Sequence, residues 1–283
     1  MLRRRAERMY EEKLDLREPI QFASEEERAA AIAFFNAAYR AEESGLTQAH
    51  ALADEIAARD PDLAECLRLY GNEEGWHREL LTEFIAYLGG TIKPMGRVTG
   101  TFYRLYGQAD RVETIVLTNL MFETIGSTTY RLALRRATHP AGRHVLAILT
   151  RDESFHVPLN VHFLREALAH AEDGLAERWA MRLRLQGVYH LLYVALIASS
   201  AASRRRAEAF DHIPFSELST AYAEHLGRLF LRERDLAFTP SSTLLRLFGL
   251  DRAALAAAED LSVVSIEAAE NAVDRERVVV SAL

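Results

Sequence analysis

Residues 72–77 read Asn-Glu-Glu-Gly-Trp-His, and residues 151–156 repeat the pattern as Arg-Asp-Glu-Ser-Phe-His. Each stretch holds a Glu followed three positions later by a His, as Glu74–His77 and Glu153–His156. On an α-helix, side chains three residues apart lie on one face, so the carboxylate and the imidazole of each pair can reach a single ion. One such pair alone is a weak signal, because Glu and His fall at this spacing by chance.

Both pairs lie on a helical face that the apolar residues around them define. The first is flanked by Leu63, Leu67, Tyr70, Leu81 and Ile85, and the second by Leu146, Leu149, Val157, Asn160 and Leu164. A stripe with this spacing is the face that a helix turns toward a core. A carboxylate there is costly unless it is paired, protonated or bound to a metal. The context therefore favours metal ligands over residues exposed to solvent.

Two further glutamates stand on apolar stripes of their own, each upstream of one pair. Glu42 precedes Glu74 by 32 residues, and Glu123 precedes Glu153 by 30. Glu43 is the alternative to Glu42, but the residues that share its face are more polar.

The predicted ligand set therefore comprises Glu42, Glu74, His77, Glu123, Glu153 and His156. Four carboxylates and two imidazoles suit two divalent ions, because they combine hard oxygen donors with borderline nitrogen donors and nearly balance the charge.

The periodicity predicts helices nearly throughout the chain. The expected spans are 24–59, opened by a Ser24–Glu27 capping box, then 61–88, 108–138, 141–172, 175–207 and 216–234, with a long connection over 91–108. Pro158 is expected to kink the fourth helix or to end its first half. Residues 1–23 form a charged arm, 24–236 one helical domain with a core bundle over 24–172, and 237–283 a tail.

At these motifs the sequence resembles the ferritin-like non-haem di-iron carboxylate proteins, over about residues 24–172. The paired strings are similar to those of acyl-carrier-protein desaturases, aldehyde-deformylating oxygenases and tRNA hydroxylases. The chain departs at one position from the arylamine N-oxygenases of the same superfamily. Those proteins carry an extra His four residues before the last motif Glu, where this chain has Leu149. The resemblance implies an all-α, ferritin-like four-helix bundle with additional C-terminal helices. It also implies two Fe ions, or a Mn/Fe pair, that activate O2 with electrons from an external donor such as a reductase or ferredoxin.

Several other residues are candidates for supporting roles. Glu73 and Asp152 each precede a ligand Glu and are placed to accept a hydrogen bond from the His of the opposite motif. An ordinary acid on the helix surface is the equal alternative for both. Ser127 and Thr128 are candidates for a proton relay, although helical hydroxyls usually bond to their own backbone.

Four residues beside the expected ligands outline a possible substrate pocket: Tyr39, Gly45, Gly126 and Tyr130. The two glycines remove side chains where a channel could open, and close helix packing is an equally good explanation. For the two tyrosines, the alternative is core packing.

Composition excludes several classes of protein. The single cysteine, Cys66, leaves no intrachain disulfide and no cysteine-cluster metal site, and the net charge of −7 disfavours general nucleic-acid binding, with tRNA left open. The most apolar run, 188–198, is too short to span a membrane. We expect a cytoplasmic enzyme, compatible with a homodimer, that oxidises a hydrophobic small molecule or a carrier-bound acyl chain. The alternative is a non-catalytic or iron-storage protein of the same fold.

Overall fold

The computed structural model describes residues 2–95, 100, 111–169, 174–210, 212–236 and 238–257, with the backbone alone for 175 and 196–210. These residues form an all-α bundle, and no strand occurs among them. Most of the connection expected over 91–108, and the tail beyond 257, lie outside the described residues. Within the described part of the chain, no helix is long and apolar enough to cross a membrane.

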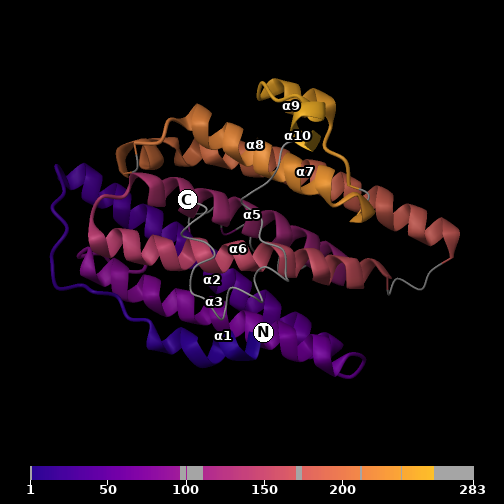
Figure 1. The fold of residues 1–283 in the computed structure, drawn as a ribbon, viewed down its shortest axis with the longest axis horizontal. Coiled ribbons are helices and arrows are strands. Elements are labelled where there is room, and N and C mark those ends of the chain that lie inside the picture. The colour runs from indigo at the N-terminus through magenta and orange to yellow at the C-terminus, as the bar shows by residue number, and fades with distance from the viewer. Residues whose placement is uncertain are drawn as a thin grey trace.

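Four long helices form the centre of the bundle (Figure 1). They are α2 (Glu25–Ile56), α3 (Pro61–Tyr87), α5 (Val112–Arg136) and α6 (Pro140–Ala169). Helix α2 packs along α3 and α5 along α6, and contacts of α2 with α5 and of α3 with α6 join the two pairs. The prediction of an all-α helical bundle is therefore confirmed.

Local sequence signals explain where α2 and α3 begin and end. The Ser24 hydroxyl accepts from the backbone N–H of Glu27 at 3.1 Å, which satisfies one free donor of the first turn of α2. Asp60 caps α3 in the same way, at 3.0 Å from the N–H of Leu63, with Pro61 in the first turn. Helix α3 gives way to Gly89 at φ +73°, a left-handed conformation that glycine adopts without strain.

Pro158 does not end α6, which is continuous from Pro140 to Ala169. A proline inside a helix costs roughly 3 kcal/mol, since it removes a hydrogen bond and crowds the preceding turn. Its neighbours Val157 and Leu159 are both buried in the core. Burial of this kind on both sides of the proline outweighs the local cost and keeps the helix intact.

The chain adds helices on two opposite sides of this centre (Figure 1). Along α3 lies α1 (Leu2–Arg8), which continues into a 3-10 turn at Met9–Glu11, so the expected arm is partly helical and docked. On the other side, α7 (Leu175–Phe210) and α8 (Phe215–Arg232) pack against α5. They are the two additional helices that the sequence predicts. The described part of the tail forms two short helices, α9 (Ser242–Leu247) and α10 (Arg252–Ala257).

The apolar core is divided into two clusters along the bundle. One contains Phe35, Phe84 and Leu146. The other contains Leu52, Leu120 and Phe163 and extends to α7 and α8. Buried carboxylates occur on all four central helices, and the buried imidazoles His77 and His156 lie next to residues of these clusters, Trp76 and Phe155.

Candidate metal centre

The six predicted ligand side chains converge inside the bundle, one from α2, two from α3, one from α5 and two from α6. All are buried, and the most exposed, Glu123, has only 8% of its surface accessible. Their ligand atoms form two groups, and within each group all atoms lie within 4.8 Å of one another. The first group is Glu42, Glu74, His77 and Glu153, and the second is Glu74, Glu123, Glu153 and His156. The structure thus brings together buried groups that could hold a metal ion.

The two groups overlap in a regular way. Glu74 and Glu153, one from each Glu-x-x-His motif, belong to both groups. His77 has Glu42 as its own carboxylate, with 3.2 Å between Nδ1 and Oε2. His156 faces three carboxylates, at 3.0 Å from Glu74, 3.6 Å from Glu123 and 3.8 Å from Glu153. This arrangement offers each of two ions one imidazole and one carboxylate of its own, and two carboxylates in common.

Two atoms of this cluster are buried without a hydrogen bond. They are Oε1 of Glu74 and Nδ1 of His156, which lie 3.0 Å apart. Buried polar atoms are nearly always paired, and an exception calls for a specific cause. A cation between these two atoms would satisfy both, so the donor set fits a metal.

Crowding of negative charge divides the four carboxylates into two kinds. Burial and repulsion from Glu123 and Glu42 raise the pKa of Glu74 well above its ordinary value, and the same causes raise the pKa of Glu153. Burial would also raise the pKa of Glu123, but the neighbouring Glu153 and the nearby His156 ring lower it to about 2. Glu74 and Glu153 are therefore harder to ionise than Glu123, and a bound cation would favour their ionised form.

The surrounding acids also shift the pKa values of the two imidazoles, His77 and His156. Burial alone would lower the pKa of His77, but hydrogen bonds to Asp152 and Glu42 raise it to about 10. For His156, burial again acts downward, and the surrounding carboxylates, led by Glu74, raise its pKa well above the ordinary value. The surrounding acids therefore favour the protonated form of both rings in the absence of a metal.

The outer nitrogen of each ring bonds to the acid that was expected from the opposite motif. Nε2 of His77 lies 3.1 Å from Oδ2 of Asp152, and Nε2 of His156 lies 3.2 Å from Oε2 of Glu73. An ionised carboxylate can only accept, so each Nε2 carries the proton and donates. Each Nδ1 is then directed at the carboxylate cluster, as a metal ligand requires.

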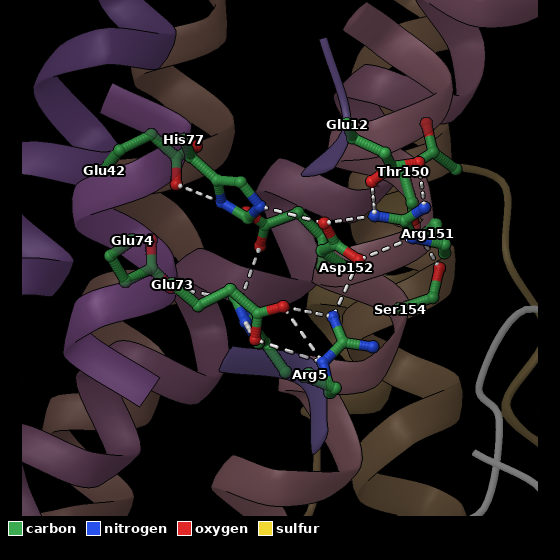
Figure 2. Close-up of polar contacts among 12 residues, drawn as sticks. Arg5, Glu12, Glu42, Glu73, Glu74, His77, Thr150, Arg151, Asp152 and Ser154 are labelled. Atoms are coloured by element: carbon green, nitrogen blue, oxygen red, sulfur yellow. Dashed lines mark hydrogen bonds and ion pairs between the residues drawn. The ribbon is translucent and has the colours of Figure 1, made fainter. Parts of the chain in front are cut away.

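Two arginines hold these outer acids, and sequence reasoning missed both. Arg5 of α1 contacts Glu73 and Asp152 together, and Arg151 contacts Asp152 through Nε at 2.7 Å (Figure 2). Burial raises the pKa of Glu73, but attraction to Arg5 and the hydrogen bond from His156 lower it to about 2. The partners of Arg5 lie 68 and 147 residues away in the sequence, so no local pattern indicates them.

Two tyrosines donate to the inner carboxylates. The Tyr130 hydroxyl donates to Oε1 of Glu42 at 2.7 Å, and the Tyr70 hydroxyl donates to Oε1 of Glu123. The Tyr70 ring also stands edge-on to His156, with 4.8 Å between centroids. Both phenols therefore fix the carboxylates from outside the cluster.

Three of the four predicted pocket residues line one cavity, and the fourth does not. Gly45, Gly126 and Tyr130 line a cavity of about 40 Å³ with all four ligand glutamates. Tyr39 is absent from that lining: its hydroxyl contacts Glu43 at 3.5 Å, and its ring lies under Arg40. Tyr39 instead packs against the apolar core cluster that contains Phe35 and Phe84, which agrees with the alternative of core packing.

The predicted proton relay does not contact the cluster either. Thr128 donates to the backbone carbonyl of Thr124 at 2.7 Å and also contacts His225. Ser127 accepts from Arg131 at 3.1 Å. Neither hydroxyl bonds to a ligand glutamate in the described structure, since helical threonine readily bonds to its own backbone one turn earlier.

A second, larger cavity lies at the end of the bundle where α2 ends and α5 begins. Its volume is about 700 Å³, and apolar side chains such as Leu67, Val116 and Phe163 line it, with Arg59 and Arg111 among the polar ones. Phe163 contacts Tyr70, with 6.5 Å between ring centroids. Tyr70 thus stands between this cavity and the carboxylate cluster.

No family model, no curated protein and no solved structure matches this chain.

Proposed function

We propose that this protein is an O2-dependent di-iron oxidoreductase that oxidises a hydrophobic small molecule or a carrier-bound acyl chain. The observation that carries the proposal is the pair of overlapping groups, each with one imidazole, one carboxylate of its own and two shared carboxylates. Oxygen and imidazole donors of this kind suit iron, and a Mn/Fe pair is compatible with the same set. When bound, such a pair of ions would supply the reduction of O2, with electrons from an external reductase or ferredoxin-type donor.

The protein's own residues would have three tasks. Glu42 with His77, and Glu123 with His156, would each hold one ion, and Glu74 and Glu153 would bridge the two. Asp152 and Glu73 would keep each imidazole oriented through its outer nitrogen. Tyr70 and Tyr130 would hold the rotamers of Glu123 and Glu42.

The two cavities support different versions of this function. The cavity against the ligand glutamates is about 40 Å³, which accommodates a water-sized molecule or O2 but no organic substrate. This small space favours the alternative, a ferritin-like protein that only oxidises or stores iron. The cavity of about 700 Å³ has the size of a small-molecule site and combines apolar with charged lining residues, which favours the enzyme.

Iron loading separates the two versions. Protein loaded with Fe²⁺ under anaerobic conditions is mixed with O2, and absorbance and iron content are followed through repeated additions of iron. We expect an oxidative optical change and an iron content that stays at two per chain. An iron content that rises far above two would establish storage, and no optical change on O2 addition would contradict the oxidoreductase.

A screen of apolar ligands then addresses the substrate. Fatty acids and other apolar acids or amines are tested for binding to the metal-loaded protein, and a Met181→Trp variant narrows the large cavity that Met181 lines. We expect this variant to lose the ligand while it keeps its iron. If Met181→Trp leaves ligand binding unchanged, the ligand binds outside the large cavity.

A further inference from the structure

The N-terminal helix α1 presents one arginine to solvent and buries another. Arg3 pairs with Glu65 at 2.6 Å, and its side chain is 73% exposed. Arg5, two residues on, is only 12% exposed and contacts two buried acids. Its guanidinium also lies over the ring of Phe155, at 4.5 Å from the centroid. A buried charge is tolerated only where partners compensate it, so Arg5 has a specific site in the bundle.

That site lies between the two acids that hold the imidazoles. Figure 2 shows the Arg5 guanidinium between Glu73 of α3 and Asp152 of α6. Its Nε donates to Oε1 of Glu73 at 2.9 Å, and its Nη2 donates to Oδ1 of Asp152 at 2.7 Å. A planar guanidinium can bridge two carboxylates in this way, because its donors diverge in one plane.

Each of these acids accepts from one imidazole of the centre. Glu73 accepts from His156, and Asp152 accepts from His77. One residue of the N-terminal segment is therefore connected, through a single carboxylate each time, to both imidazoles. A second connection comes from the same segment, since Glu12 pairs with Arg151 at 2.6 Å and Arg151 contacts Asp152.

We propose that Arg5, in the N-terminal segment of residues 2–12, is a positioning residue of the metal centre, and that its docking between Glu73 and Asp152 is coupled to metal binding. The inference rests on the proposed function, since it requires the centre to bind metal. Docked Arg5 fixes Glu73 and Asp152, and these fix the two rings with Nδ1 directed inward. Coupling between two binding events is reciprocal, so a bound metal strengthens the docking of the segment by the same factor.

The first test is an anaerobic titration with Co²⁺, a spectroscopically visible substitute for Fe²⁺, on wild type and three variants. Arg5→Ala is expected to lower Co²⁺ affinity about tenfold or more, the usual effect of losing support behind a ligand His. The Co²⁺ affinity of Arg5→Lys should lie between those of wild type and Arg5→Ala, because a single ammonium group cannot contact both carboxylates as the guanidinium does. Arg3→Ala, on the same helix with an exposed partner, should bind Co²⁺ as wild type does.

The second test measures the reciprocal effect. Amide hydrogen exchange of residues 2–12 is compared in metal-free and Co²⁺-loaded protein. We expect Co²⁺ to slow exchange in wild type and in Arg3→Ala, and to have little effect in Arg5→Ala. Substitution of a residue with only a structural role would change the exchange rates equally with and without metal. The comparison therefore distinguishes a positioning residue from one that only packs.

The outcomes are distinct. Wild-type Co²⁺ affinity in Arg5→Ala, equal losses in Arg5→Ala and Arg3→Ala, or exchange unaffected by metal would each overturn the inference while metal binding stands. A wild-type protein that binds no Co²⁺ would overturn the proposed function and this inference with it. If circular dichroism shows that Arg5→Ala does not fold, the comparison of Arg5→Lys with Arg3→Ala decides the question.

Discussion

The two sides of the candidate centre are built on different principles. On the imidazole side, each His is held by an outer acid, and Arg5 and Arg151 compensate those acids. On the carboxylate side, four glutamates face a cavity of about 40 Å³ beside Gly45 and Gly126, and no basic residue lines it. On the imidazole side each outer acid is held by an arginine and a ring nitrogen, whereas on the other side four carboxyl groups crowd together beside open space. The contrast marks the carboxylate side as the place where a cation could be held.

The largest expected effect comes from removal of a shared ligand. Glu153→Ala takes a carboxylate from both groups, and His77→Ala takes a ligand from one. We expect Glu153→Ala to weaken binding of both ions and His77→Ala to abolish tight binding of at least one. Anaerobic Co²⁺ titration measures both.

Glu43→Ala is the control for these variants. Glu43 pairs with Arg40 on the surface of α2 and belongs to neither group, so its loss should leave the titration unchanged. If Glu43→Ala instead removes an ion while Glu42→Ala has no effect, the assignment of the ligand on α2 is wrong by one residue.

A large effect of pH is expected next. Glu74, Glu153, His77 and His156 all have raised pKa values, so in the metal-free protein this cluster takes up protons more readily than free side chains do. Metal binding must displace these protons, so affinity rises with pH. Each proton released contributes about a factor of ten per pH unit, and we expect more than one. Calorimetry in buffers of different ionisation enthalpy counts them, and affinity that is independent of pH between 6 and 8 would refute the charge state assigned to this cluster.

The two glycines of the carboxylate side should respond differently to the same substitution. A Cβ at Gly45 would lie 3.1 Å from the carboxyl group of Glu74, whereas one at Gly126 would meet Glu153 at an ordinary 3.6 Å. Gly45→Ala forces Glu74 to move, and overpacking of this kind typically costs about 1–3 kcal/mol, so we expect Co²⁺ affinity to fall by roughly 5- to 150-fold. Gly126→Ala should bind Co²⁺ normally. Equal behaviour of the two variants would mean that Glu74 has room to adjust.

The smallest expected effect is that of a single hydrogen bond on the carboxylate side. Tyr130→Phe removes the donor at 2.7 Å from Glu42, which we expect to lower the affinity of one ion severalfold with both ions still bound. Tyr39→Phe is the matched control, because its hydroxyl contacts Glu43 instead. A loss as large as that of His77→Ala would make Tyr130 a ligand rather than its support.

The comparison also shows which features the sequence could reveal. The six central residues were predictable because each interrupts an apolar stripe of helical period, so that burial follows from position alone. Glu73 and Asp152 followed from their places beside the motif glutamates, and the structure has both hydrogen bonds.

Arg5 could not be predicted in the same way. It lies in a run of arginines, Arg3 to Arg5, in which nothing local marks the one that is buried. Its partners are on α3 and α6, so its role depends on how α1 packs against the assembled bundle. Tyr39 illustrates the same limit, since it shares the stripe of Glu42 but packs against the apolar core and does not line the cavity beside the glutamates. Helical period predicts which face a residue occupies, and tertiary contacts decide where a long side chain finally lies.

The central claim is that the bundle holds a centre for two metal ions with shared carboxylates. The stoichiometry of anaerobic Fe²⁺ binding to the purified wild-type chain tests this claim most directly. It is measured by titration and by elemental analysis after free metal has been removed. The account predicts two Fe²⁺ per chain, both lost or weakened together in Glu153→Ala. A chain that retains no Fe²⁺, or one that retains a single Fe²⁺ unaffected by Glu153→Ala, would contradict it.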